Sequence, residues 1–151
     1  MGFAINTTFV GDTFLTPEIL DKHRIPFYWD VQTGLTTLTT LKTQILPFKH
    51  IVAGHGEIYT SIEQANRAIE YTIDRLESIL ENIRAALTDD KPQPGADILS
   101  TVAHAQGAHI HTFSQYVLYN TTVQSALSTL YKRGEVSPIF HENTLAWHRT
   151  I

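Results

Sequence analysis

The longest regular pattern in the chain is a stripe of aliphatic residues whose positions alternate by four and three. This spacing places the stripe on one face of an α-helix. The helix is expected to begin at Ser61, because Ser61-Ile62-Glu63-Gln64 matches a capping box, in which a serine hydroxyl and a glutamine side chain bind exposed backbone amides. We predict a helix over residues 61–87 that packs on its own domain or on a partner helix. The stripe consists of Ile69, Ile73, Leu76, Leu80, Ile83 and Leu87.

Shorter patterns precede this helix. Residues 3–5, 7–10 and 51–53 are short runs typical of strands. Leucines at positions 35, 38 and 41 have helical spacing, which predicts a helix over residues 35–45. The first half is therefore expected to be a mixed α/β region.

The second half of the chain has a different pattern. The run Lys-Pro-Gln-Pro-Gly at 91–95 interrupts regular structure, and we expect it to divide the chain into domains 1–90 and 91–151. Three short helices are predicted over 98–105, 113–119 and 123–133, the last capped by Thr121 and Thr122 and closed by Gly134. Apolar residues on both sides of the polar turn Glu142-Asn143 predict a hairpin. This order of helices and hairpin is typical of a winged helix.

The amino-acid composition of the chain limits its possible locations, partners and metal ligands. The chain has 151 residues, 42% of them hydrophobic, which suffices for one core or slightly more. It contains neither a run of ~20 apolar residues nor a secretory leader pattern, so we expect a cytoplasmic protein without a membrane partner. The net charge of −4 gives no general attraction to nucleic acid. Because cysteine is absent, histidine and carboxylate side chains are the plausible metal ligands.

Two strand ends carry candidate ligands. Gly54-His55-Gly56 follows the apolar run 51–53, and Gly11-Asp12 follows the run 7–10. Glycines beside a histidine permit a close backbone approach that a Cβ would obstruct, so this loop is suited to presenting a ligand. The structural alternative is that Asp12 caps a turn and His55 donates a hydrogen bond across the loop.

Other polar and aromatic residues have simpler interpretations. Asp30 is expected to cap the helix that follows it. Tyr28 and Trp29 are interpreted as core residues rather than as the lining of a substrate cleft. His109 and His111 are expected in a loop before the next helix. The remaining histidines are interpreted as surface or packing residues, namely His23, His50, His104, His141 and His148.

The ordered motifs resemble the C-terminal half of the metallo-β-lactamase fold. They are Gly11-Asp12, Ile25-Pro26-Phe27, Asp30 and Gly54-His55-Gly56. The resemblance implies an α/β fold, the second half of an αββα sandwich, followed by a mainly helical, winged-helix-like subdomain. It also implies that Asp12 bridges two metal ions and that His55 ligates the second one. The implied metals are zinc, iron or manganese, and the implied substrate of the intact enzyme is a small molecule.

The main metal motif of that family, His-x-His-x-Asp-His, is absent from the chain. The single His-x-His, at 109–111, continues as Thr112-Phe113-Ser114 and lacks the Asp-His pair. Two ligands cannot form a dinuclear site. We therefore expect the chain to be a C-terminal portion of a larger metallohydrolase, with weak or no metal occupancy and without catalysis on its own. Whether this chain is an enzyme stays open at this point.

Two further function classes follow from the pattern. If residues 123–133 formed a recognition helix, Gln124, Ser125, Ser128 and Lys132 would offer polar contacts to nucleic acid. The tail has few cations for phosphate contacts, so nucleic acid is the disfavoured partner. A half-fold would also leave sheet edges and apolar surface uncovered. We therefore predict a homo-oligomer, formed through the helical stripe over residues 69–87.

Overall fold

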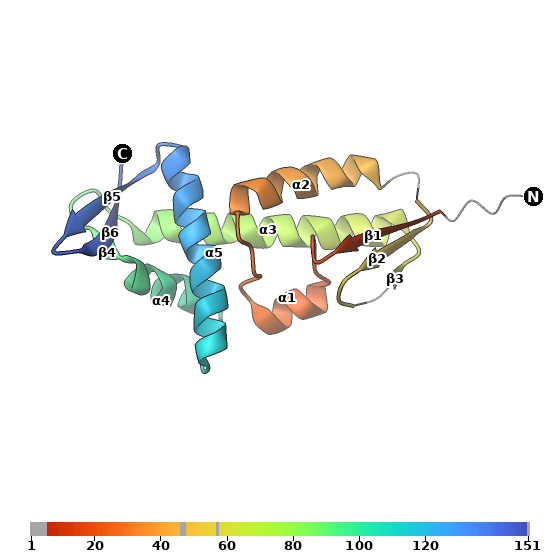
Figure 1. Ribbon diagram of the computed structural model, residues 1–151, viewed down its shortest axis with the longest axis horizontal. Coiled ribbons are helices and arrows are strands. Elements are labelled where there is room, and N and C mark those ends of the chain that lie inside the picture. Colours follow the sequence, from red (N-terminus) through yellow and green to blue (C-terminus); the bar gives the residue numbers. More distant parts are fainter. Residues whose placement is uncertain (1–5, 46–47, 57, 151) are drawn as a thin grey trace, which may run out of the picture. The chain divides into compact units, whose positions relative to one another are not determined.

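The protein is described by a computed structural model that covers residues 6–45, 48–56 and 58–150. The strand expected over residues 3–5 lies outside the described residues. Helices and strands follow one another as shown in Figure 1. The strands are β1 (Thr7–Gly11), β2 (His50–Ala53), β3 (Ile58–Tyr59), β4 (Gln93–Pro94), β5 (Val136–His141) and β6 (Thr144–Arg149). The helices are α1 (Pro17–His23), α2 (Val31–Gln44), α3 (Ile62–Ala86), α4 (Gly95–Ala105) and α5 (Phe113–Lys132).

The chain forms two compact units. The first comprises Met1–Lys22 and Thr33–Asp74, and the second comprises His23–Gln32 and Arg75–Ile151. The boundary between them falls inside α3, because Asp74 and Arg75 are consecutive residues of that helix. The division expected between residues 90 and 91 differs from this one and stays a prediction.

The first unit contains a three-stranded sheet of order β1-β2-β3, in which β1 is parallel and β3 antiparallel to β2. The strands expected over 7–10 and 51–53 are confirmed. Cross-strand pairing aligns Thr8, Ile51 and Tyr59 in one row, and Ile51 and Tyr59 are buried. The next row, Phe9, Val52 and Ile58, lies on the opposite face because side chains alternate along a strand. Phe9 is 78% exposed and Ile58 is 59% exposed, so this outer face is apolar and open to solvent.

The expected helices of the first half are present. The helix predicted over 35–45 is part of α2, in which Leu35 and Leu38 are buried. Asp30 directly precedes α2, at the position expected for a cap. The helix α1 begins after Thr16, whose hydroxyl accepts a hydrogen bond from the amide of Ile19. Proline at the first helical position suits this cap, since its missing N–H would have no partner there.

The helix α3 confirms the longest sequence pattern. It begins one residue after Ser61, whose hydroxyl donates to the carboxylate of Glu63 in the first turn. The stripe is buried at Ile69, Leu76, Leu80, Ile83 and Leu87. The predicted route to an oligomer through this stripe is therefore wrong, because the chain itself covers these side chains. No helix in the described part of the chain is long and apolar enough to cross a membrane.

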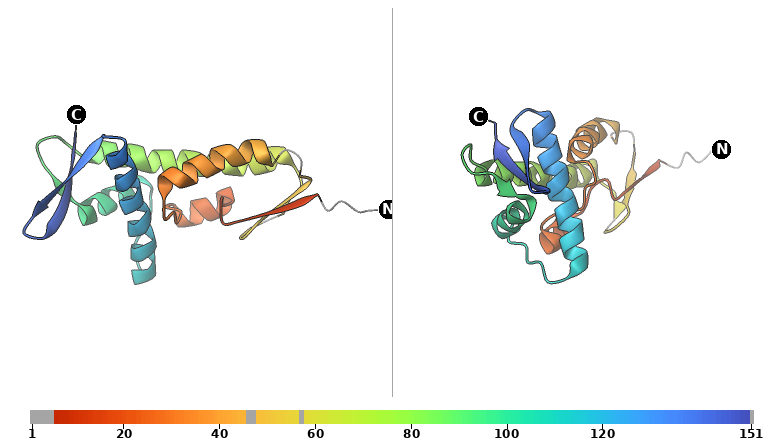
Figure 2. Two further views of the ribbon diagram at one scale, coloured as in Figure 1. Left: turned by 45° about the horizontal axis from the view of Figure 1, so that its top comes forward. Right: turned by 60° about the vertical axis from the view of Figure 1, so that its left-hand side comes forward.

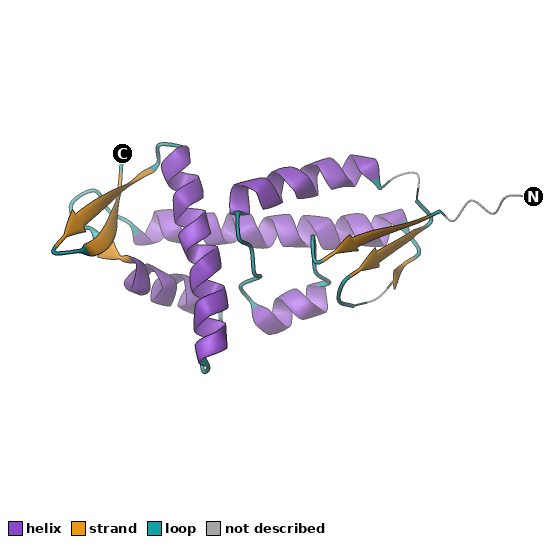
Figure 3. Ribbon diagram, in the orientation of Figure 1, coloured by secondary structure: helices purple, strands orange, loops and turns teal. Residues whose placement is uncertain are grey.

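The second unit differs from the sequence prediction in one element. The two helices expected over 113–119 and 123–133 are a single helix, α5, which runs without a break in every view (Figures 2 and 3). Thr121 and Thr122 are therefore not caps. The hydroxyl of Thr121 donates to the carbonyl of Val117 inside the helix, and the true caps are Thr112 and Arg133-Gly134. Because one helix replaces two, the winged-helix outline is not confirmed.

Residues 23–32 form a segment that is fastened to α5 by side-chain hydrogen bonds. The Thr122 hydroxyl accepts from the amide of Tyr28 at 3.0 Å and donates to the carbonyl of Pro26 at 2.8 Å. The Ser125 hydroxyl accepts from the amide of Val31 at 2.8 Å. Tyr119 donates to the carbonyl of His23 at 2.6 Å. The hydroxyl-bearing residues Tyr119, Thr122 and Ser125 therefore lie on the face of α5 that contacts residues 23–32.

The two aromatic residues of this segment have different surroundings. Tyr28 is partly buried, and burial raises the pKa of its phenol well above the ordinary value. Trp29 is 80% exposed, so the prediction that it is a core residue is wrong. Hydrogen bonds to α5 hold the backbone at Tyr28 and Val31, on either side of Trp29, whose side chain stays in solvent.

The C-terminal hairpin is confirmed. Strands β5 and β6 pair in the register Val136↔Arg149 to His141↔Thr144, and the turn residues Glu142 and Asn143 have positive φ. The short strand β4, which lies inside the expected interruption at 91–95, pairs with β6 and gives the order β4-β6-β5. The guanidinium of Arg84 donates twice to Glu135, which precedes the hairpin, and this pairing lowers the pKa of Glu135.

Candidate metal-binding site

The candidate site lies where β1 and β2 end. The strands are parallel, so their carboxyl ends share one edge of the sheet, and the pairing continues beyond the strands through a 2.7 Å hydrogen bond from the amide of Gly54 to the carbonyl of Gly11. The ladder is irregular between Phe9 and Gly11. This irregularity and the turn that follows redirect the chain at Asp12. The two segments singled out from the sequence are therefore adjacent in space.

Asp12 and His55 contact each other directly. Nδ1 of His55 lies 2.8 Å from Oδ1 of Asp12, and since an ionised carboxylate only accepts hydrogen bonds, His55 is the donor. The side chains are 60% and 69% exposed for Asp12 and His55, respectively. The pair has no further hydrogen-bond partner among the described residues. Donation from Nδ1 leaves Nε2 of His55 with its lone pair free, which is the arrangement that suits an imidazole for metal binding.

Both glycines beside His55 lie close to neighbouring side chains. A Cβ at Gly54 would overlap Oδ1 of Asp12, so the carboxylate occupies the space that a side chain would need. Gly56 has φ of +102°, and a Cβ there would overlap the Thr16 methyl group. The loop is thus closely packed against Asp12 on one side and against the cap of α1 on the other.

The turn after β1 fixes Asp12. Gly11 has φ of +55°, and both the amide and the hydroxyl of Thr13 donate to the carbonyl of Val10, at 3.2 and 2.6 Å. This closes a four-residue turn with Asp12 at a central position. Asp12 therefore has a defined place in the turn, as the structural alternative proposed, and also contacts His55.

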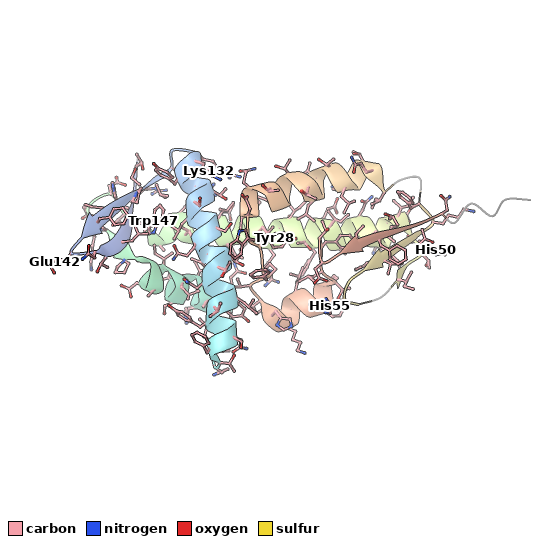
Figure 4. The ribbon with its side chains drawn as sticks, viewed as in Figure 1. Tyr28, His50, His55, Lys132, Glu142 and Trp147 are labelled. Atoms are coloured by element: carbon pink, nitrogen blue, oxygen red, sulfur yellow. The ribbon has the colours of Figure 1, made fainter. Side chains whose placement is uncertain are left out.

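The structure keeps the other candidate residues apart from this pair. His50 pairs with Thr7 at the amino end of β2, the opposite end from His55 (Figure 4). His109 and His111 lie in the loop before α5, as predicted, with ring centroids 5.8 Å apart and nearly parallel. Within the described residues, no group of three or more histidine or carboxylate side chains could hold a metal ion.

The comparisons with known proteins bear on the fold. No protein-family model matches the chain, and no curated protein matches it in sequence. Solved structures do match. A β-lactamase domain protein from Burkholderia ambifaria aligns with a TM-score of 0.72 and 16% identity, over 95% of this chain and 41% of that one. A metallo-β-lactamase family protein from Thermus thermophilus aligns with a TM-score of 0.66 and 15% identity, over 96% of this chain and 42% of that one.

The chain has part of a metallo-β-lactamase fold. The resemblance inferred from Gly11-Asp12 and Gly54-His55-Gly56 is thereby confirmed at the level of fold. The chain spans about two fifths of the length of the solved structures that it matches. At this level of identity the match concerns the fold alone, so the chemistry of the site has to be argued from its own residues.

The donor set fits a metal ion of the kind that this fold implies. A carboxylate and an imidazole are suitable ligands for zinc, iron or manganese. Two side chains are fewer than the four ligands of a closed zinc site and fewer than the three protein ligands of an open one. Asp12 and His55 can therefore contribute to a metal site, but a complete site needs further ligands.

One feature of the site had no clear sequence signal. The contact between Gly56 and Thr16 joins the histidine loop to the start of α1. The Thr16-Pro17-Glu18 run is a typical helix start and could have been recognised as a cap. Its contact with a loop forty residues later depends on tertiary structure and could not.

Proposed function

We propose that this chain supplies two ligands, Asp12 and His55, to the dinuclear metal site of a metal-dependent hydrolase of the metallo-β-lactamase type. The remaining ligands come from further polypeptide, whether in the same chain or in another. The observation that carries the proposal is the 2.8 Å contact between these side chains at the shared carboxyl edge of two parallel strands. Ligand sites of open α/β sheets characteristically lie at this edge.

The two residues have separate roles in this proposal. Asp12, with two carboxylate oxygens, is suited to bridge two cations and offset their repulsion. His55 is suited to be a terminal ligand through Nε2. Because Nε2 lies on the far side of the imidazole ring from Asp12, the hydrogen bond between the two side chains is released when both turn toward the metal ions. When bound, zinc, iron or manganese activates water as a nucleophile for hydrolysis of a small-molecule substrate. Their hydrogen bond keeps both side chains close together before any metal arrives.

The outer face of the first unit's sheet supports the need for further polypeptide. Its row of Phe9, Val52 and Ile58 is apolar, and two of these side chains are more than half exposed. A sheet face of this kind ordinarily packs against another layer of structure. The same added layer can bring the missing ligands to the edge where Asp12 and His55 lie.

Zinc titration of the chain, followed by amide chemical shifts in NMR, tests the ligand assignment. We expect weak binding that shifts the amides near Asp12 and His55, and about a tenfold or greater loss of affinity in Asp12→Asn and in His55→Ala. His50→Ala is the matched control, because it removes a histidine from the amino end of β2, away from the site. Unchanged zinc binding in both site variants would rule the assignment out.

The activity requires a separate test. In a longer natural polypeptide that contains this chain, we expect metal-dependent hydrolysis that Asp12→Asn reduces by at least two orders of magnitude. Activity that persists in Asp12→Asn, or that survives complete metal removal, would contradict the hydrolase proposal while leaving the zinc titration of the short chain unaffected.

The oligomeric state and the location also belong to this proposal. We infer a cytoplasmic protein, and a homo-oligomer for the chain studied without the further polypeptide, because the face around Phe9 and Ile58 is then uncovered while the stripe of α3 is buried. Phe9→Ser should then lower the association constant measured by sedimentation, and a monomer at micromolar concentration would contradict association. A nucleic-acid-binding tail has weaker support, because α5 is one helix and the guanidinium of Arg133 donates to Gln32.

A further inference from the structure

The second unit has an open pocket with a volume of about 460 Å³ along one face of α4. Small-molecule sites have volumes of roughly 300–1,000 Å³, so the pocket is of a useful size. Its floor is aliphatic and includes Leu99, Ala103 and Ala108, all buried. The described lining contains no carboxylate. The pocket belongs entirely to the second unit and is independent of the metal-site proposal.

Two capping motifs fix the walls of this pocket. At the end of α4, the amide of Ala108 donates to the carbonyl of Ala103 at 2.8 Å, and that of Gly107 donates to His104 at 3.0 Å. This is a Schellman motif, and the positive φ of Gly107 lets the chain turn back over the helix. The reversal places Ala108 and the residues after it opposite the exposed face of α4.

The second motif begins α5. The side chain of Thr112 accepts from the amide of Gln115, and the Gln115 side chain accepts from the amides of Thr112 and His111. These bonds fix the loop that carries His109 and the first turn of α5, which carries Tyr116. The ring of His109 is further held by stacking on His111. Both walls of the pocket are therefore held by hydrogen bonds within the chain.

Four polar side chains line the pocket: Ser100, His104, His109 and Tyr116. None of them has a hydrogen-bond partner in the part of the chain that the structure describes. Each can donate a hydrogen bond, through a hydroxyl or an imidazole N–H. An aliphatic floor with unpartnered donors and no carboxylate is complementary to a ligand with an apolar body and an acceptor, preferably anionic, at one end.

We propose that this pocket binds a medium-chain carboxylate, whose aliphatic chain covers Leu99, Ala103 and Ala108 and whose carboxylate accepts hydrogen bonds from donors of this set. Butanoate, hexanoate and octanoate are the probes, and NMR amide shifts measure Kd. Burial of each methylene should strengthen binding by up to roughly fourfold. Affinity independent of chain length, or shifts outside the pocket, would overturn the proposal.

A bulky side chain introduced on α4 tests whether the carboxylate binds in this pocket. Ser100→Trp places an indole in the pocket from an exposed helical position, and we expect at least a tenfold loss of octanoate affinity. Thr101→Trp is the matched control, because Thr101 is exposed on the same helix and does not line the pocket. Equal losses in the two variants, or none in Ser100→Trp, would overturn the assignment.

Comparison of a carboxylate with the alcohol of the same chain length tests whether the pocket prefers an anionic acceptor. Hexanoate should bind several-fold more tightly than hexan-1-ol, and the variant His104→Ala/His109→Ala should remove most of this preference. If the alcohol binds as tightly as the carboxylate, the carboxylate proposal is wrong.

Discussion

The two units use polar side chains in opposite ways. In the first unit, Asp12 and His55 are exposed and bind each other at the end of a sheet. In the second unit, Thr122 is fully buried and satisfies two backbone groups of the segment over residues 23–32. An exposed pair contributes little to stability, whereas a buried hydroxyl with two backbone partners contributes substantially. Thr122 therefore serves folding, whereas the Asp12–His55 pair is available for the metal binding proposed above.

The largest effect is expected from removing the hydroxyl of Thr122. Thr122→Val keeps the shape of the side chain but leaves the amide of Tyr28 and the carbonyl of Pro26 without this partner. We expect the free energy of unfolding to fall by about 2–3 kcal/mol, measured by urea denaturation. Thr121→Val is the control, because its hydroxyl binds only the carbonyl of Val117 in the same helix, and it should cost under about 0.5 kcal/mol. Equal costs would remove the contrast between the units.

A smaller effect is expected at the histidine loop. Gly56→Ala forces a side chain into a backbone conformation with positive φ and against Thr16. We expect a loss of about 1–2 kcal/mol in urea denaturation. Gly11→Ala separates the two causes, because Gly11 also has positive φ but open space around its Cβ. A larger loss at Gly11 than at Gly56 would show that the Thr16 contact is unimportant.

The Arg84–Glu135 pair predicts a pH dependence in the second unit. Hydrogen bonds from Arg84 lower the pKa of Glu135 below its ordinary value of 4.5. The pair therefore stabilises the folded state above pH 4.5, and this contribution is lost as the pH falls through the lower folded pKa. Because both side chains are partly exposed, we expect less than about 1 kcal/mol. Glu135→Gln should flatten the acid side of the stability profile, and Glu142→Gln, in the exposed turn, should not.

The smallest effect is expected from the candidate ligands. Asp12→Asn and His55→Ala should each change the free energy of unfolding by under about 0.5 kcal/mol, because both side chains are exposed. The measurement is urea denaturation without metal. A loss above about 1 kcal/mol would mean that the pair is structural, and would weaken its assignment as a metal site.

Local patterns predicted most of the fold. The stripe of α3 and the strands β1 and β2 follow from periodicity, and the hairpin follows from the Glu142-Asn143 turn. The predicted break in α5 was wrong because the same residues suit two different structures. Thr121-Thr122 resembles a helix start, but in α5 the Thr122 hydroxyl binds a segment more than ninety residues away in sequence.

The candidate site could be predicted only in part. Asp12 and His55 were identifiable because each lies between a strand end and a turn, with glycine beside it. Their contact could not be deduced from spacing, since it depends on the parallel register of β1 and β2. The pocket beside α4 was not predicted, because its polar side chains are brought together by two caps rather than by a motif.

The attachment of the 23–32 segment to α5 also has a consequence for synthesis on the ribosome. Its hydrogen bonds join residues that are 94 to 96 positions apart. At translation rates of 5–20 residues per second, this segment is synthesised roughly 5–20 s before its partners in α5. Ile25 and Pro26, which are buried in the folded chain, thus lack their cover in the nascent chain until α5 has been made. This segment is therefore a site at which a chaperone can bind the growing polypeptide.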